Sequence, residues 1–512
     1  MVQYGRMYRK GGSMTKTMRT AACLLLLCAC TALYAQSDNG DFGDVAEADE
    51  SDLTEKNVSD DQSRMSDFGD ALDFGKTEFT KADFRHSAIA AGEVVSFNIF
   101  ITTFNRVVMR SEFADISLAT IGHNITHPWV WDQDEFEINQ IGHPYQGSMY
   151  FAAGRANGFN FWQSFAFAAF GSLMWEYTME NEPPSFNDFI HTPVGGSFLG
   201  EMFHRIYLSL DDKYPYLSWI ASPQAAFNRL LTGEKAVRES GDIEEFSVSL
   251  SVDHIDTAFD FSDKAYKDTG YRNAVSGGIG FDLVYGNPYV RDVQKPFEQF
   301  MLSSGVSFDG NYYDIKIAAN GLLRSWVFEP NDALATTLAV DLSYDFIMAT
   351  DLNYQNNSAG FSVRQKHELP HAWTIEWKSG AGATYLGASD YYFNLKGNKR
   401  KSIYDGSEQR LYDLGIGGNV KAGFKASNVW AGTFSLDGAF SAFYTIPGSE
   451  PPEGFSGYNL IWYGNAGYEH RIYKNYYAGL SFFFYQKFGF YKKGLDVFQT
   501  TSDWKLYVKR YF

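Results

Sequence analysis

The sequence has little cysteine and no long apolar run beyond its N-terminal region. Its three cysteines, Cys23, Cys28 and Cys30, all lie within or beside the apolar stretch 21–29. Removal of that stretch would leave no thiol, which excludes a disulfide framework and thiolate chemistry in the remaining chain. Because no clean run of about 20 apolar residues follows, we expect no membrane-spanning helices.

Basic charge and familiar catalytic fingerprints are also scarce. The chain has 43 Lys and Arg against 61 Asp and Glu, a net charge of −18. Nucleic-acid-binding proteins carry basic patches, so we expect no nucleic-acid partner. The common nucleophile-elbow, phosphate-loop and dinucleotide fingerprints are missing, and the sequence implies no cofactor. Residues 367–371 match HExxH, but Pro370 blocks the helix that a zinc protease needs.

The N-terminal region has the pattern of an exported precursor. Lys16 and Arg19 precede the apolar stretch, and the small-residue pattern 32–35 follows it. This predicts a signal peptide over residues 1–35. Cys30 also lies in a lipoprotein-like cleavage pattern, so lipidation stays open. Residues 36–83 are acidic and predict a disordered linker.

Aromatic residues, at 17%, and glycine, at 47 residues, are abundant, which suits a membrane barrel. From about residue 243 the chain alternates with period two. Leu338, Val340 and Leu342 share one face, whereas Asp341 and Ser343 share the other. Such alternation predicts strands with one lipid-facing side and one polar luminal side. We therefore predict an all-β transmembrane barrel of about 12 antiparallel strands over residues 242–512.

The final nine residues, 504–512, alternate large apolar side chains with Lys and Tyr and finish on Phe512. This is typical of the last strand of a bacterial outer-membrane barrel. It predicts the outer membrane of a Gram-negative-type bacterium as the location and outer-membrane lipids as partners. Phe512 is the predicted recognition element for the barrel assembly machinery.

Residues 84–241 do not alternate and predict an α-helical module. Residues 149–180 are apolar nearly all round, which predicts one long buried helix. A second helix is expected to begin with Thr192 as its cap and Pro193 at its first position. Small residues recur at Gly154, Gly158, Gly196 and Gly200, so the two helices are expected to form a tight hairpin. The module is expected to plug the barrel lumen or to lie under its periplasmic mouth.

Polar residues gather in this otherwise apolar module. Glu176 and Glu180 share one helix face, and Glu201 and Arg205 can pair at the same spacing. Buried charges must be paired, so a structural clamp is the simplest interpretation. Crowded carboxylates with a histidine could also serve acid–base chemistry or hold a ligand or a metal. The candidate cluster contains Asp132, Asn139, His143, Arg155, Glu176, Glu180, Asp188, Thr192, Glu201 and Arg205.

The run from about Ser87 to Asp211 resembles a bacterial envelope family known as domain of unknown function 3943. The matching positions include Trp131-Asp132, His143-Pro144-Tyr145, Trp175-Glu176 and Asn187-Asp188. The resemblance implies an outer-membrane-associated protein with a downstream barrel. It implies no activity.

These observations favour a non-enzymatic outer-membrane protein that passes small solutes or lipids or has a structural role in the envelope. The alternative is a membrane-embedded hydrolase that acts on envelope lipids through the His/Glu/Asp cluster. The alternative predicts a cleft that reaches His143, whereas the favoured interpretation predicts a sealed cluster. The small-molecule ligand and any metal stay unknown.

Overall fold

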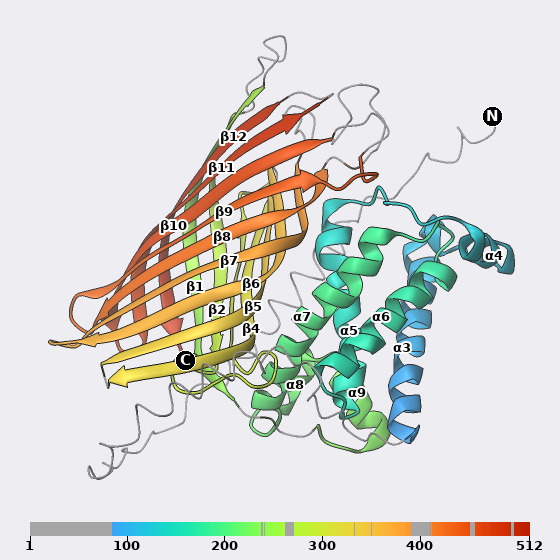
Figure 1. Ribbon diagram of the computed structural model, residues 1–512, viewed down its shortest axis with the longest axis horizontal. Coiled ribbons are helices and arrows are strands. Elements are labelled where there is room, and N and C mark those ends of the chain that lie inside the picture. The colour runs from blue at the N-terminus through green and yellow to red at the C-terminus, as the bar shows by residue number, and fades with distance from the viewer. Residues whose placement is uncertain are drawn as a thin grey trace.

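The computed structural model describes a barrel with a helical module beside it (Figure 1). The predicted signal peptide, its cysteines and the acidic linker lie outside the described residues. The structure describes residues 84–236, 239, 241–261, 271–331, 333–349, 351–390, 410, 412–450, 456–492 and 496–512.

Twelve antiparallel strands close into one barrel, in which β1 pairs with both β2 and β12. The predicted fold class and strand number are confirmed. We call the end where β1 begins and β12 finishes the terminal end, and the other the opposite end. The strands are β1 (Ile243–Phe261), β2 (Tyr271–Tyr285), β3 (Phe300–Phe308), β4 (Tyr313–Asn331), β5 (Leu334–Ala349), β6 (Leu352–Leu369), β7 (Trp373–Asp390), β8 (Tyr412–Asn428), β9 (Gly432–Thr445), β10 (Gly457–Tyr473), β11 (Tyr476–Tyr491) and β12 (Val497–Tyr511).

The pairing of β1 with β12 fixes which parity faces outward. Asp253 is opposite Lys505, and their side chains lie 3.6 Å apart inside the barrel. Leu250 and Leu506 belong to the other parity, and each is 65% exposed. Alternating apolar and polar residues therefore divide the wall into an outward and a luminal face, as the sequence predicted.

Side chains from opposite walls meet inside the lumen. Lys316 of β4 pairs with Asp503 of β12 at 2.7 Å, and Lys421 of β8 pairs with Asp345 of β5 at 2.6 Å. The luminal lysines of these pairs are thus bound to carboxylates. A cluster that we call the aromatic septum crosses the lumen between them; it consists of Ile347, Tyr354, Phe443, Ile461, Tyr463, Phe483 and Tyr485.

The described part of the module contains seven α-helices, two π-helical turns and one 3-10 turn. The helices are α3 (Phe84–Phe104), α4 (Leu118–Thr126), α5 (His143–Ala156), α6 (Phe161–Thr178), α7 (Phe186–Asp211), α8 (Pro215–Ala221) and α9 (Pro223–Thr232). The shorter turns are η2 (Asn105–Met109), η3 (Glu112–Ala114) and η4 (Ile138–Gly142).

The helix expected over 149–180 is two helices. Gly158 has φ +84 and stops α5, and the Asn160 side chain caps α6 by accepting from the Gln163 amide. The second helix also begins earlier than expected. Ser185 caps α7 by accepting from the Asp188 amide, which leaves Pro193 inside the helix rather than at its start.

Helices α5 and α7 run parallel, because α6 returns the chain between them. The contact is closest at Gly147 and Gly196: a Cβ on Gly147 would lie 1.8 Å from the Thr192 carbonyl oxygen. Gly154 and Gly200 also pack closely, against Ser164 and Phe151. A Cβ on Gly158 would meet nothing within 4 Å, so its predicted role in a helix contact is wrong. The predicted hairpin is instead a three-helix arrangement.

The module packs against the outside of the barrel (Figure 1). Its Phe136 stacks on Phe346 of β5 at 5.5 Å, and Phe198 meets Phe297, which lies between β2 and β3, at 5.1 Å. Phe346 belongs to the outward parity, since its neighbour Asp345 is luminal. The described helices therefore do not plug the lumen or lie beneath it, contrary to the expectation from sequence. The aromatic septum crosses the lumen instead.

Helix α3 with η2 also differs from expectation. The segment Phe84–Met109 is long and apolar enough to cross a membrane by length and composition, although we expected no such helix. Glu93 and Asn98 interrupt the apolar run in the sequence, but both are buried against other helices. Only 28% of the apolar window is buried inside the protein.

Candidate functional site

The ten candidate residues fall into two groups at opposite ends of the parallel pair α5 and α7. His143 and Asp188 belong to the first group, and Arg155 and Glu201 to the second. Twelve residues along α5 and thirteen along α7 separate the groups, which is about 18–20 Å at 1.5 Å per residue. The sequence analysis predicted one cluster of all ten residues, whereas the fold divides them between two places.

Asp132 is the centre of the first group. Its carboxylate accepts from the Asn139 and Asn187 side-chain amides at 2.7 Å each and from the Ser185 hydroxyl at 3.1 Å. Burial alone would raise the pKa of Asp132, but hydrogen bonds from Asp188 and Asn139 and the nearby His143 lower it. An ionised Asp132 thereby ties the segment before η4 to the start of α7.

Burial, together with the charge of Asp132, raises the pKa of Asp134 well above its usual value. The pKa of Glu182, which lies exposed at the edge of the group, is also raised, by partial desolvation and by the charge of Asp132. In this group Asp132 favours its ionised form, because hydrogen bonds stabilise its charge. Its carboxyl neighbours favour their neutral forms. This division keeps several carboxyl groups close together without mutual repulsion.

His143 bridges Asp188 and Thr192. Its Nε2 lies 3.3 Å from a carboxyl oxygen of Asp188, and its Nδ1 lies 3.3 Å from the Thr192 hydroxyl. All three side chains are buried. Hydroxyl, imidazole and carboxyl therefore follow in the order of a nucleophile, a base and its orienting group, but within a packed helix interface.

Glu176 and Glu180 do not join this line of contacts directly. Glu176 accepts from the Ser185 amide at 2.7 Å, and Glu180 accepts from the Trp175 indole at 2.9 Å. Glu176 thus holds the end of α6 against the start of α7, whereas Glu180 bonds back to α6 itself. Asn124 of α4 bonds the backbone carbonyls of both glutamates, which fixes that helix to the same end.

The second group is a closed set of two arginines and two glutamates. Glu201 contacts Arg155 at 2.8 Å and Arg205 at 2.9 Å. Glu239 contacts the same two arginines at 2.5 and 3.1 Å. Burial would raise the pKa of Glu239, but the two guanidiniums lower it to about 2. The group is electrically neutral, as buried charges require.

Several residues of both groups escaped the sequence analysis. Glu239 lies in the connection to β1, and Arg410 in the connection between β7 and β8. The Arg410 guanidinium donates to the Asp132 carbonyl at 2.7 Å, and the Tyr412 hydroxyl donates to the Asp134 carbonyl at 3.0 Å. Asn187 was part of the family pattern but not of the candidate list. No local pattern marks Glu239 or Arg410, since their partners are 34 to 278 residues away.

The geometry suits a clamp more directly than a catalytic centre. Glu176 is fully buried and His143 is 7% exposed, so these two side chains lie inside the helix packing, whereas Asp132, Asp134 and Glu180 are half-buried. Within the described ranges, no three His, Cys, Asp or Glu side chains form a group that could hold a metal ion. Both groups link the module to itself and, through Arg410 and Arg205, to the barrel.

Residues 128–224 match the family described as "Domain of unknown function (DUF3943)". This confirms the family resemblance and places both α5 and α7 within the matched segment. No curated relative matches the chain.

The barrel is similar to those of solved outer-membrane channels and porins. "CymD monoaromatic hydrocarbon channel" is 9% identical with a TM-score of 0.20, and covers 52% of this chain and 89% of that chain. "KdgM porin" is 11% identical with a TM-score of 0.20, and the match covers 51% of this chain and 98% of that chain. The Pseudomonas putida toluene transporter TodX is 8% identical with a TM-score of 0.22, and the match covers 52% of this chain and 89% of that chain. At these scores the likeness carries no argument about what this barrel does.

Proposed function

We propose that this chain, whose residues 128–224 form a DUF3943 segment, is a bacterial outer-membrane protein with a non-conducting barrel. In this proposal the barrel is a closed support that carries the helical module on its outer wall. A closed antiparallel barrel with an apolar outward face is the architecture of bacterial outer-membrane proteins. The proposal selects the structural role over solute passage.

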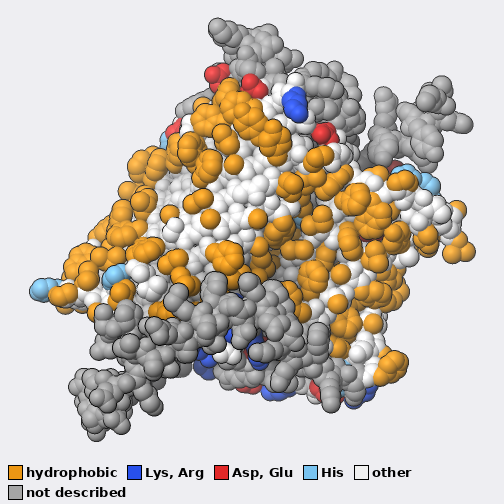
Figure 2. Space-filling model, viewed as in Figure 1, with side chains coloured by type: hydrophobic (Ala, Val, Ile, Leu, Met, Phe, Trp, Pro, Cys, Tyr) orange, Lys and Arg blue, Asp and Glu red, His pale blue; other side chains and the backbone are white. Residues whose placement is uncertain are grey.

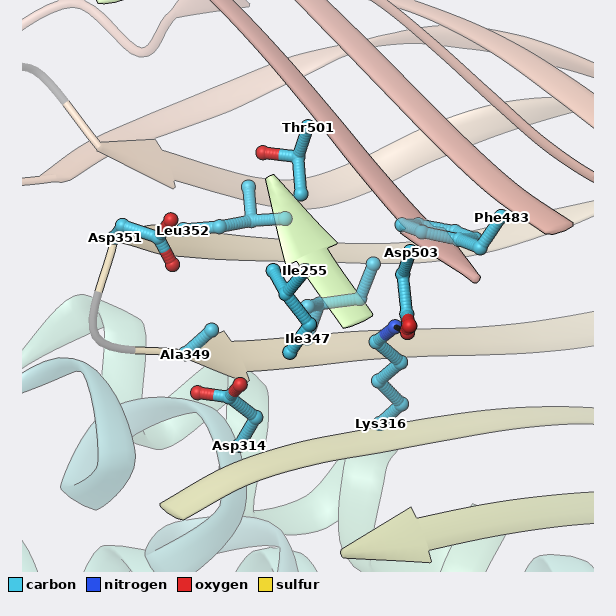
Figure 3. A pocket seen from close by; sticks show the side chains of 10 residues that line it. All are labelled: Ile255, Asp314, Lys316, Ile347, Ala349, Asp351, Leu352, Phe483, Thr501 and Asp503. Atoms are coloured by element: carbon cyan, nitrogen blue, oxygen red, sulfur yellow. Dashed lines mark hydrogen bonds and ion pairs between the residues drawn. The ribbon is translucent and has the colours of Figure 1, made fainter. Parts of the chain in front are cut away.

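The packing of the lumen carries this proposal. The Tyr354 hydroxyl of β6 lies 2.9 Å from the Ser441 hydroxyl of β9, and its ring is 6.0 Å from that of Tyr485 on β11. A cavity of about 10 Å³ beside the septum has room for about one water molecule. Figure 3 shows the side chains that line this cavity, among them Lys316 and Asp503, which pair with each other. Passage of a solute would require these contacts to part.

Planar-bilayer recording tests the proposal. The purified full-length protein should give no steady conductance. The double variant Tyr354→Ala/Tyr485→Ala removes two septum rings and should open a measurable current, whereas the outward control Tyr458→Ala should stay silent. Steady wild-type channels as large as those of the double variant would show that the barrel conducts and would overturn the proposal.

A hydrolase that acts on envelope lipids is the second candidate, because Thr192, His143 and Asp188 follow one another at 3.3 Å. Lipid turnover by the purified protein should be absent if the group is a clamp. Thr192→Val and Glu176→Gln should then lower the melting temperature. Turnover that is lost in either variant while melting stays native would favour the hydrolase.

We extend the proposal to assembly through Phe512. Its amide donates to the Phe246 carbonyl at 3.0 Å, and the two rings lie 5.6 Å apart, so the residue closes the seam between β1 and β12. Deletion of Phe512 should lower the amount of heat-modifiable protein in the membrane, whereas Phe512→Tyr should not. Equal insertion of the deletion variant would contradict this role.

A further inference from the structure

The outer surface of the helical module has the same chemistry as the bare wall of the barrel. Ile99 and Phe100 on α3 are 52% and 62% exposed, and Phe170 and Leu173 on α6 are 43% and 38% exposed. Figure 2 shows hydrophobic side chains continuing from the barrel over the module, with charged side chains mainly near the upper and lower edges of this view. A soluble module would leave such a surface in contact with water.

The module also lies at the depth of the barrel's membrane-facing wall. At one end of α7, Ser185 is tied to Asp132, whose carbonyl accepts from Arg410 at the opposite end of the barrel. At the other end, Arg205 donates to the Pro296 carbonyl between β2 and β3, at the terminal end. The 20 residues between Ser185 and Arg205 span about 30 Å. That length matches the hydrocarbon core of a bilayer.

The exposed charged side chains of the module lie at its two ends. Arg85 pairs with Glu234 at 3.4 Å, and Lys235 pairs with Asp212 at 3.5 Å, at the terminal end. At the opposite end, Arg106 pairs with Asp115 at 2.6 Å. In α3 between Arg85 and Arg106, and in all of α6, the exposed residues that the structure describes are uncharged. The 21 steps from Arg85 to Arg106 correspond to about 32 Å of helix.

From these observations we infer that the module is embedded in the bilayer beside the barrel, with α3 and α6 exposed to lipid acyl chains. The inference rests on the proposed outer-membrane location. The helices satisfy their backbone polar groups internally, so they can border lipid as the barrel does. The buried carboxyl of α3 is also hydrogen-bonded inside the module: Glu93 accepts from Asn157, Gln224 and Asn228 at 2.9–3.3 Å.

Lipid quenching of site-specific labels tests this inference. Single variants Phe100→Cys and Phe170→Cys are labelled with an environment-sensitive fluorophore in the full chain. They are reconstituted in phosphatidylcholine–phosphatidylethanolamine vesicles with or without lipids that carry a doxyl group on the acyl chain. Leu506→Cys on β12 reports the barrel's lipid face, Lys213→Cys reports the charged terminal end, and the unsubstituted chain gives the background from Cys23, Cys28 and Cys30. Heat-modifiable migration checks that each variant is assembled.

We expect quenching at Phe100 and Phe170 within about twofold of that at Leu506, and several-fold above that at Lys213. Ile99→Cys and Leu173→Cys replace either site if a variant fails to assemble. Quenching of the helix sites only to the Lys213 level overturns the inference and leaves the barrel's location intact. Weak quenching with cross-linking between copies through Phe100 or Phe170 overturns it in favour of a second copy on this face. Loss of quenching at Leu506 as well would overturn the outer-membrane proposal itself.

Discussion

Two arcs of the barrel wall have the same outward chemistry and different surroundings. On the bare arc, formed by β9–β12 and β1, Leu250 and Val252 are 65% and 59% exposed. On the covered arc, within β2–β8, Phe346 and Leu414 are fully buried beneath the module. Both arcs alternate apolar and polar residues with the same period.

The difference between the arcs lies in polar groups at the tips of aromatic side chains. The Tyr344 hydroxyl donates to the Gln140 carbonyl at 2.5 Å, and the Tyr412 hydroxyl donates to the Asp134 carbonyl. These bonds fix the module's position, whereas apolar contact alone would allow it to slide. The apolar outward face of a strand thus shows only that it is not solvated. The hydrogen bonds of the tyrosine hydroxyls determine that the helical module covers this arc.

A substitution that forces apart the helices of the module should lower the free energy of unfolding most. Gly147→Leu places a side chain where a Cβ already meets the Thr192 carbonyl oxygen at 1.8 Å. Helices α5 and α7 would have to separate, at a cost above about 3 kcal/mol. Urea unfolding and limited proteolysis of the module measure the change. Gly122→Leu in α4, where nothing lies within 4 Å, is the matched control, and coincident unfolding of both variants would contradict the close contact.

A matched pair of phenylalanines compares the arcs directly. Phe346→Ala leaves a cavity beside Phe136 in the covered arc and should lower the free energy of unfolding by about 3–5 kcal/mol. Phe484→Ala on the bare arc removes a side chain that is 36% exposed and should cost about 1 kcal/mol. Both values come from urea unfolding in the same detergent. Equal costs would mean that the module does not cover Phe346.

The Arg–Glu group gives a pH-dependent version of the comparison. The pKa of Glu239 is lowered to about 2, so its ionised form stabilises the fold fully above its usual pKa of 4.5. That contribution is lost as pH falls through 4.5 towards 2. Glu239→Gln should therefore cost roughly 3 kcal/mol at pH 7, and its difference from wild type should narrow over that range. Melting curves at pH 7, 4 and 3 measure this. Glu234→Gln, in an exposed pair, should change stability by less than about 1 kcal/mol; a Glu239→Gln difference independent of pH would exclude the ionised clamp.

Removal of a single hydroxyl group should change the free energy of unfolding least. Tyr344→Phe removes the bond to Gln140 and should cost about 1–2 kcal/mol, because a buried carbonyl is left without that donor. Tyr458→Phe on the bare arc, where the side chain is 38% exposed, should be close to neutral. Hydrogen exchange of η4 should increase only in the first variant. Identical exchange in both would remove the hydroxyl as the feature that distinguishes the arcs.

The sequence by itself determined the barrel. Alternation is a local property, because successive strand residues point to opposite faces whatever their partners are. The 12 strands and the luminal placement of Asp345, Lys316 and Lys505 therefore follow from residue parity. The family pattern likewise identified Asp132, His143 and Asp188, and the structure brings those three together.

The tertiary structure alone decided how the module folds and where it lies. A helix that is apolar on all sides has no pattern that shows which face contacts which neighbour. The sequence therefore could not show that α5 runs parallel to α7 or that the module lies outside the barrel. The Gly147–Gly196 contact depends on that crossing, and so does the separation of Arg155, Glu201 and Arg205 from the Asp132 group. Glu239 and Arg410 complete the two groups from distant loops. Their roles arise from charge pairing across the folded chain, which no local spacing encodes.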